Sequence, residues 1–235
     1  MIRNLFIFIS VLVSLEAVAS GITIGKIVTP YVQQLEKEIE YEWVLQNDDR
    51  AQFADQRKHR LGYGQSINDR WFLEAEIVGL DLPGQDFDIA GYEFEAKYQI
   101  SEQGEFSNDW GVLFEIERES DREVWEFATT LVVLHEWKKW IGTANLTLAY
   151  EAGPSIDDEL ETELATQLRY RGNAWFEPGI EFFKSQSTNA AGPSISGKIR
   201  LGGGRKVFWS TAALFSFDSS KPDNVIRFNI EYEFQ

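Results

Sequence analysis

The chain of 235 residues contains no cysteine, and its one methionine is the initiator. The lack of cysteine excludes disulfide bonds and thiolate metal sites. Soft metals such as copper also lack their preferred ligands. Basic residues are few, since 22 lysines and arginines stand against 38 acidic residues and the net charge is −16. This balance argues against nucleic acid and anionic lipid surfaces as partners, because both require clustered basic residues.

The chain also lacks an apolar run long enough for a membrane-spanning helix, which needs about 20 residues. The longest run, at 5–15, is interrupted by two serines and follows a short basic start. Residues 17–19 (Ala-Val-Ala) fit the small-x-small pattern of a secretory cleavage site. We therefore expect a signal peptide at 1–19 and an exported mature chain. An uncleaved helical anchor is the less favoured alternative.

Tryptophan recurs about every 35 residues, each time at the start of an alternation of apolar and polar residues. Five of the eight tryptophans follow this spacing: Trp71, Trp110, Trp140, Trp175 and Trp209. A period of two predicts strands with one apolar face. An indole at one end of every second strand is typical of a membrane–water interface, because the ring is apolar and its N–H needs a polar partner. We expect these tryptophans to form the periplasmic girdle of a membrane barrel.

Alternating runs separated by turn residues predict twelve strands. Their predicted ranges are 35–45, 57–67, 71–79, 89–100, 109–118, 123–134, 140–151, 159–171, 175–184, 193–201, 206–218 and 224–234. Short connections alternate with longer polar ones, as in bacterial outer-membrane barrels. The predicted fold is therefore all-β: a closed, antiparallel, up-and-down transmembrane β-barrel over 35–235. Residues 20–34 would form a periplasmic segment or a plug in the lumen.

Two regions fit this pattern less well. The alternation weakens at the end of the strand 123–134, where Val132 and Leu134 would face inward. Pro178 lies inside the strand 175–184 and cannot donate a hydrogen bond to the ladder, so we expect a β-bulge there.

The second face of the predicted strands carries the charged residues, which a barrel in lipid directs into a wet interior. Six glutamates form a predicted permeation wall: Glu74, Glu76, Glu93, Glu95, Glu115 and Glu117. Lys198 and Arg200 form a basic patch on the tenth strand, opposite this wall in a twelve-stranded ring. The two would create a transverse field that orders charged solutes. In a soluble sandwich, the less favoured fold, the charged face would be the solvated exterior.

The same charges can instead brace the ring as cross-strand ion pairs. The residues expected in such lumen pairs are Glu40, Glu42, Lys58, Arg60 and Arg227, and a pair between Glu181 and Lys198 is also expected. Bracing and permeation are equally favoured and do not exclude each other.

The sequence offers little for catalysis. Its two histidines, His59 and His135, lack the serine or aspartate neighbours that outer-membrane phospholipases and aspartyl proteases place beside theirs. Glutamates in a wet lumen are expected without hydrolysis, so they are weak indicators of acid–base chemistry. We expect no enzyme activity, no cofactor and no metal site.

The last predicted strand alternates up to an aromatic residue and resembles the segment read by the barrel-assembly machinery. The residues of this assembly signal are Phe228, Tyr232 and Phe234, although the chain ends in Gln235 rather than in the aromatic itself. Nearly the whole mature chain resembles Gram-negative outer-membrane β-barrel proteins. Its length and strand count are similar to those of small twelve-stranded channels such as the oligogalacturonate-specific family. That family uses basic lumens for acidic sugars, whereas this interior is acidic, so the substrate does not carry over.

The sequence thus predicts an outer-membrane barrel that passes small solutes and prefers cations. A structural or interaction barrel with an occluded lumen is the alternative. The expected partners are outer-membrane lipid and lipopolysaccharide, the barrel-assembly machinery and small solutes, with no nucleic acid.

Overall fold

The computed structural model describes residues 24–48, 55–120, 123–217 and 222–235. The predicted signal peptide at 1–19 lies outside these residues. Within the described ranges, no helix is long and apolar enough to cross a membrane.

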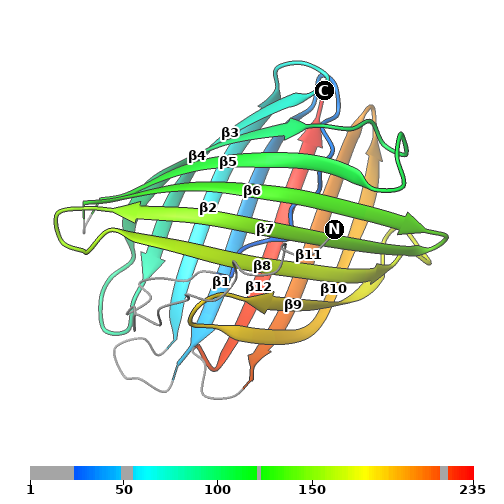
Figure 1. Cartoon of the computed structure of the whole chain (residues 1–235). Coiled ribbons are helices and arrows are strands. Elements are labelled where there is room, and N and C mark those ends of the chain that lie inside the picture. The colour runs from blue at the N-terminus through cyan, green and yellow to red at the C-terminus, as the bar shows by residue number, and fades with distance from the viewer. Residues whose placement is uncertain (1–23, 49–54, 121–122, 218–221) are drawn as a thin grey trace, which may run out of the picture.

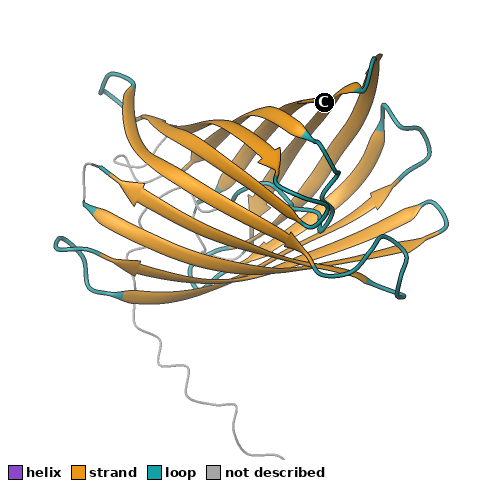
Figure 2. Ribbon diagram, turned by 90° about the horizontal axis from the view of Figure 1, so that it is seen from above, coloured by secondary structure: helices purple, strands orange, loops and turns teal. Residues whose placement is uncertain are grey.

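Twelve strands make up the regular structure of the described residues (Figure 1). They are β1 (Lys37–Asn47), β2 (Gln56–Ser66), β3 (Trp71–Asp81), β4 (Asp88–Gln99), β5 (Asp109–Glu119), β6 (Val124–Trp137), β7 (Trp140–Ala152), β8 (Glu159–Tyr170), β9 (Glu177–Lys184), β10 (Asn189–Gly202), β11 (Arg205–Ser216) and β12 (Asn224–Phe234). Each strand pairs antiparallel with its sequence neighbours, and β1 pairs with β12 to close the ring. Figure 2 shows the same strands turned by 90° about the horizontal axis. The predicted closed up-and-down barrel of twelve strands is confirmed.

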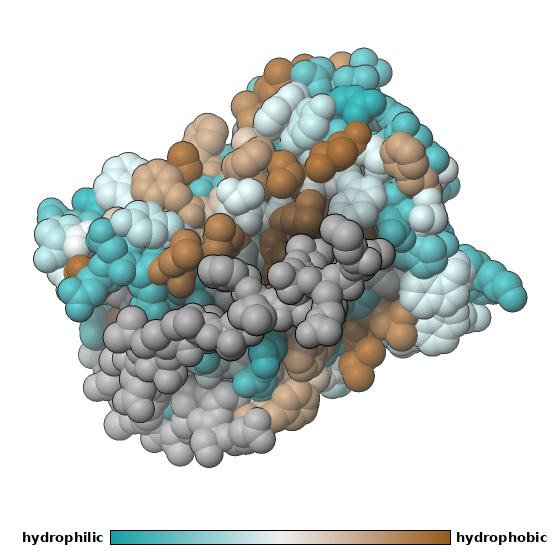
Figure 3. Space-filling view, in the orientation of Figure 1, coloured by the Kyte–Doolittle hydropathy of each residue, from teal (hydrophilic) through white to brown (hydrophobic). Residues whose placement is uncertain are grey.

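The two faces of the wall differ as the alternation predicts. On β4, Tyr92 and Phe94 are each 57 % exposed, whereas Glu93 between them is 6 % exposed. Outward-facing apolar residues of this kind occur around the ring: Ile77, Phe114, Ile116, Leu146, Leu148, Ile180, Ile226 and Phe228. In Figure 3, brown hydrophobic residues lie across the middle of the visible face and teal hydrophilic ones gather toward the strand ends. An apolar belt of this extent suits lipid rather than water, which excludes the soluble sandwich.

The hairpin between β6 and β7 is tighter than predicted. β6 continues to Trp137, which pairs with Trp140, so the connection consists of two residues instead of five. Lys138 in this turn has a φ of 61°. Two-residue hairpins commonly use positive φ values, because such turns match the twist of the flanking strands. The prediction of a longer connection after residue 134 was wrong.

The β-bulge predicted at Pro178 is also absent. β9 keeps a continuous register with β10, where Pro178 lies opposite Ile195. Pairing of β9 with β8 begins only at Gly179, so Pro178 lies beyond the end of that ladder. β8 therefore has no residue that needs the missing N–H of Pro178.

Residues 24–34 form no regular element and lie inside the barrel (Figure 1, dark blue). The backbone N–H of Val28 donates to Asn145 Oδ1 at 2.8 Å, and the Val28 carbonyl accepts from Asn145 Nδ2 at 3.0 Å. The N–H of Val32 donates to Gln99 Oε1 at 2.7 Å. Side-chain amides of β7 and β4 thus satisfy the backbone of this stretch, which we call the inner segment.

Candidate functional site

The inner segment divides the lumen into two cavities. One has a volume of about 150 Å³ and is called the acidic cavity. The other, of about 470 Å³, reaches toward the barrel end where β1 begins and β12 ends, and is called the mixed cavity. Lys26, Val28, Glu40 and Glu95 line both, so the inner segment and its contacts form the partition.

The acidic cavity carries a large excess of negative charge. Its twelve glutamates are Glu40, Glu42, Glu76, Glu93, Glu95, Glu115, Glu117, Glu119, Glu126, Glu151, Glu161 and Glu163. Only three basic side chains, Lys26, Lys58 and Arg60, line the same space. Low-dielectric walls focus the field of such a charge set.

Arg60 on β2 is the centre of the largest ion-pair group in the acidic cavity. Its Nη1 lies 2.9 Å from Glu42 Oε1, and its Nε lies 3.0 Å from Glu93 Oε2. Longer contacts of 3.6 Å and 3.7 Å reach Glu76 and Glu117. One guanidinium therefore links carboxylates from four strands, β1, β3, β4 and β5, and braces that part of the ring.

Two other ion pairs form with different partners from those predicted. Lys58 Nζ lies 3.3 Å from Glu117 on β5 rather than beside a glutamate of β1. Glu181 pairs with Arg227 at 2.7 Å rather than with Lys198, and both partners are almost fully buried. In both pairs the actual partner lies three strands away in the ring, so pairing between adjacent strands does not predict it.

Lys26 is a lumen cation that the sequence did not single out. Its Nζ lies 2.5 Å from Glu40 Oε1 and 3.9 Å from both Glu74 Oε2 and Glu76 Oε1. Asn229 Nδ2 donates to the same Glu40 oxygen at 2.7 Å. Burial alone would lower the pKa of Lys26, but the surrounding carboxylates, Glu40 and then Glu74 foremost, hold the pKa well above its ordinary value. Lys26 therefore remains charged and ties the inner segment to the barrel wall.

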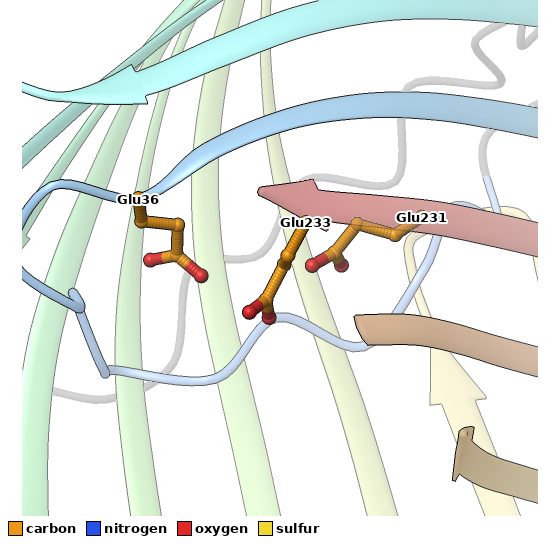
Figure 4. A group of neighbouring side chains, drawn as sticks. All are labelled: Glu36, Glu231 and Glu233. Atoms are coloured by element: carbon orange, nitrogen blue, oxygen red, sulfur yellow. The ribbon is translucent and has the colours of Figure 1, made fainter. Parts of the chain in front are cut away.

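Three groups of glutamates bring carboxylate oxygens within 4.8 Å of one another. The groups are Glu36 with Glu231 and Glu233, Glu38 with Glu40 and Glu74, and Glu76 with Glu93 and Glu95. Figure 4 shows the first group, whose carboxylates point toward one another from the start of β1 and the end of β12. Burial, and then the charge of Glu233, raise the pKa of Glu36 to about 7. Proximity alone does not identify a metal site, since such groups also accept protons or basic side chains.

An apolar surface lines the lumen from β9 through β12 and includes one residue of β1. Ile24 of the inner segment is 2 % exposed and packs in a cluster of buried inward-facing residues. The other members of this cluster are Val44, Phe183, Ala190, Ala212, Leu214 and Val225. We call these six residues the apolar wall. Burial of an isoleucine in such a cluster contributes roughly 1.5–3 kcal/mol.

A second apolar contact lies at β5 and β6, where the alternation weakens. Val132 and Leu134 face inward and are almost fully buried. Gly111 lies opposite Val132 in the ladder, and a Cβ at position 111 would stand 2.9 Å from the Cβ of Pro30. The inner segment thus approaches the wall closely at a glycine beside inward-facing apolar residues. The prediction that Val132 and Leu134 face inward is confirmed, and such inward apolar positions are a sequence signal that could have indicated an occupied lumen.

The predicted permeation residues divide between the two cavities. Glu76, Glu93, Glu115 and Glu117 line the acidic cavity, Glu74 lines the mixed cavity, and Glu95 lines both. Lys198 lines the mixed cavity, with its Nζ 5.1 Å from the centre of the Phe208 ring. Arg200 is exposed and lines neither of these cavities. Most of the predicted permeation wall therefore lies in a different cavity from the basic patch. The basic residues that pair with glutamates of this wall lie on β2 and the inner segment.

The girdle residues lie at or near the strand ends on one side of the barrel: Trp71, Trp110, Trp140, Trp175 and Trp209. The ring centroids of Trp71 and Tyr98 lie 4.7 Å apart, and those of Trp140 and Tyr170 lie 5.0 Å apart. Trp175 precedes β9 in the turn, and Trp209 lies further inside β11 than the others. The assembly-signal residues alternate along the outer face of β12: Phe228, Tyr232 and Phe234.

Neither histidine belongs to the lumen. His59 faces outward on β2, where its Nδ1 lies 2.8 Å from Tyr41 Oη and its ring packs edge-on against Phe87. His135 is exposed near the end of β6, where its Nδ1 lies 2.6 Å from the carbonyl oxygen of Ser107. The titratable groups that line the two cavities are therefore carboxylates, a tyrosine and basic side chains, which can bind charged groups by electrostatic attraction.

No protein-family model and no curated protein sequence matches the chain. Among solved structures, it is similar to KdgM porin, with a TM-score of 0.54 and 12 % identity over 84 % of this chain and 98 % of that one. KdgM porin in complex with disordered oligogalacturonate aligns with a TM-score of 0.52, at the same identity and coverage. An outer membrane channel from Pseudomonas putida F1 aligns with a TM-score of 0.57 and 11 % identity over 90 % of this chain and 99 % of that one.

At these identities the likeness shows the fold alone. That fold is the one predicted from the alternation and from the resemblance to small twelve-stranded channels. The chain therefore has the fold of Gram-negative outer-membrane β-barrel channels, and its outer surface carries the apolar belt that this membrane requires.

Proposed function

We propose that the protein is a passive channel of the outer membrane for small solutes, with a preference for cations. The acidic cavity carries this proposal, because its twelve glutamates face only three basic side chains. Such a lumen concentrates cations and repels anions. Oligogalacturonate, the ligand in the KdgM porin complex, is a polyanion that this cavity would repel. A cationic or neutral solute therefore suits the lumen better than an acidic sugar.

Passage through the barrel requires the inner segment to move, because it separates the two cavities. Its ties to the wall are of three kinds: the Lys26 ion pairs, hydrogen bonds, and the apolar contacts of Ile24 and Pro30. The hydrogen bonds involve Gly25, Val28, Tyr31, Val32 and Gln33. Contacts of this kind can break without unfolding the ladder, since none of them belongs to the strand pairing.

A structural or interaction barrel without transport is the second candidate. It is supported by the ion pairs of Arg60 with several strands and by the position of the inner segment across the lumen. The two candidates differ in one observable, which is whether ions cross the purified barrel.

The test is single-channel recording of the purified protein in a planar bilayer with a KCl gradient. We expect a conductance, with a reversal potential shifted from zero toward the equilibrium potential of potassium. The preference should fade at high salt, because the Debye length falls from about 10 Å at 0.1 M to about 3 Å at 1 M. The variant Glu95→Gln with Glu115→Gln should conduct with a weaker cation preference.

Glu102→Gln is the matched control, because Glu102 lies in an exposed turn and pairs with Arg70 outside the lumen. It should leave the reversal potential unchanged. A wild type without conductance would refute the channel and favour the structural barrel. Conductance with the same reversal potential in all variants would mean that ions do not pass the acidic cavity.

A further inference from the structure

The carboxylates around Lys26 outnumber the amine that they bind. Three of them, from Glu40, Glu74 and Glu76, lie within 3.9 Å of its Nζ. Their side chains are 4 %, 3 % and 1 % exposed, so water screens them little. Arg60 also reaches Glu76, at 3.6 Å. Buried carboxylates in this number require further cations or protons, because an unpaired buried charge is costly.

Glu74 shows most clearly that this site is built for a cation. Its Oε2 faces Lys26, whereas its Oε1 is buried without a hydrogen-bond partner among the described residues. A Cβ at Gly62 on the neighbouring strand would collide with that free oxygen. The glycine thus leaves the room that this carboxylate occupies. A buried acceptor with no donor points to a group that supplies N–H bonds at this place.

We propose that Glu40, Glu74 and Glu76 form a subsite for primary ammonium groups, which Lys26 fills in the closed lumen and an alkylammonium solute fills in its place. The Lys26 side chain is itself an alkylammonium group. The solutes that fit the subsite therefore belong to the same chemical class as the group that already fills it. A primary ammonium offers three N–H donors to separate carboxylates, which a quaternary ammonium or a potassium ion lacks.

The position of Lys26 between the two cavities makes the subsite accessible from either of them. A solute that displaces this side chain would also release one of the ties that hold the inner segment. The inference rests on the proposed channel function, since it names the solute class that the channel would favour.

Chemical rescue tests the subsite without any measurement of current. Lys26→Ala removes the amine and opens its space, whereas Lys26→Met removes the amine but fills the space. The full-length variants in detergent are heated with n-butylammonium chloride, tetramethylammonium chloride or KCl at equal ionic strength. The unfolding temperature is taken from the loss of the fast-migrating folded band on a gel.

Butylammonium should raise the unfolding temperature of K26A by roughly 3–6 °C for each tenfold increase in concentration above the dissociation constant. The other two salts should not, and K26M should respond equally to all three salts. An equal response of K26A to the three salts, or the same butylammonium response in K26M, would overturn the subsite.

If K26A does not fold unaided, the same salts are compared in refolding. Butylammonium alone should restore the folded band, and no recovery, or equal recovery in all salts, would contradict the proposal. A wild type that does not conduct would refute the channel but would leave this binding result unchanged, so the two failures are distinguishable.

Discussion

The two sides of the lumen bind the inner segment through different interactions. Toward β1 and β3, the buried carboxylates of Glu40, Glu74 and Glu76 bind the amine of Lys26. We call these glutamates, together with Arg60 and its partners, the charged wall. Toward β9 to β12, Ile24 packs on the apolar wall, and Arg227 on β12 donates to the carbonyl oxygen of Gly25. Ion pairs exchange partners with solutes and weaken with salt, whereas apolar contacts do neither. The comparison indicates that the apolar wall anchors the segment and that the charged wall responds to the solute.

The largest effect is expected for the main cation of the charged wall. Arg60→Met leaves several buried carboxylates without their shared partner and should cost about 3–5 kcal/mol of barrel stability. Arg57→Met on the same strand removes only an exposed pair with Asp81 and should cost about 0–1 kcal/mol. Equilibrium urea unfolding of the refolded barrels measures both. Equal losses would mean that the charged wall does not brace the ring.

Ile24→Ala should weaken the anchor on the apolar wall by about 2–5 kcal/mol, because it empties a buried site. The barrel itself should keep its stability, since Ile24 belongs to no strand. Hydrogen exchange followed by mass spectrometry should show faster exchange over 24–34, to the same extent at low and high salt. Ile27→Ala, at a half-buried position of the same segment, is the control with the smaller effect. Unchanged exchange in I24A would argue that the ion pairs alone hold the segment.

A charge on the lipid face should cost more than the same charge on the lumen face. Phe114→Arg places a cation in the membrane and should cost roughly 2–4 kcal/mol. Glu115→Arg, one residue further along β5, places it in the acidic cavity and should cost far less. Unfolding midpoints in detergent or lipid vesicles compare the two. If both variants lose the same stability, the assignment of the faces is wrong.

The smallest effect concerns the pH dependence at Glu36, which Glu231, Glu233, Lys97 and Gln33 surround. Burial raises the pKa of Glu36 from 4.5 to about 7, so the folded protein holds a proton that the unfolded chain releases. The stability from this group is present below pH 4.5 and is lost as the pH rises through about 7. Glu36→Gln should therefore flatten the dependence of the unfolding midpoint on pH in this window. A profile parallel to that of the wild type would contradict the assignment.

The barrel could be predicted from the sequence because lipid and the β-pleat impose one simple pattern. Successive side chains face lipid and lumen in turn, so the alternation along segments such as Trp71 to Ile77 marks each strand directly. Turn residues then separate the strands. Local chemistry of this kind sets the strand number and most strand ends within a few residues.

The contents of the lumen could not be predicted in the same way. Residues 24–34 have no periodic pattern, and the sequence left open whether they lie in the periplasm or in the lumen. The pairs of Lys26 with Glu40 and of Arg227 with Glu181 join residues far apart in the chain, so no spacing rule indicates them. Inward-facing apolar residues such as Val132, Leu134 and Leu214 are the sequence feature that could have indicated an apolar occupant.

The most direct test of the account is whether the inner segment limits passage through the barrel. The chain has no cysteine, so Pro30→Cys with Gly111→Cys creates its only thiol pair. The two Cβ atoms would lie 2.9 Å apart, and a small shift of the segment reaches the roughly 3.5–4.5 Å of a disulfide. In a planar bilayer, we predict low conductance from the oxidised form and an increase when reductant is added, with no change in the wild type. Equal conductance of the oxidised and reduced forms would contradict the account.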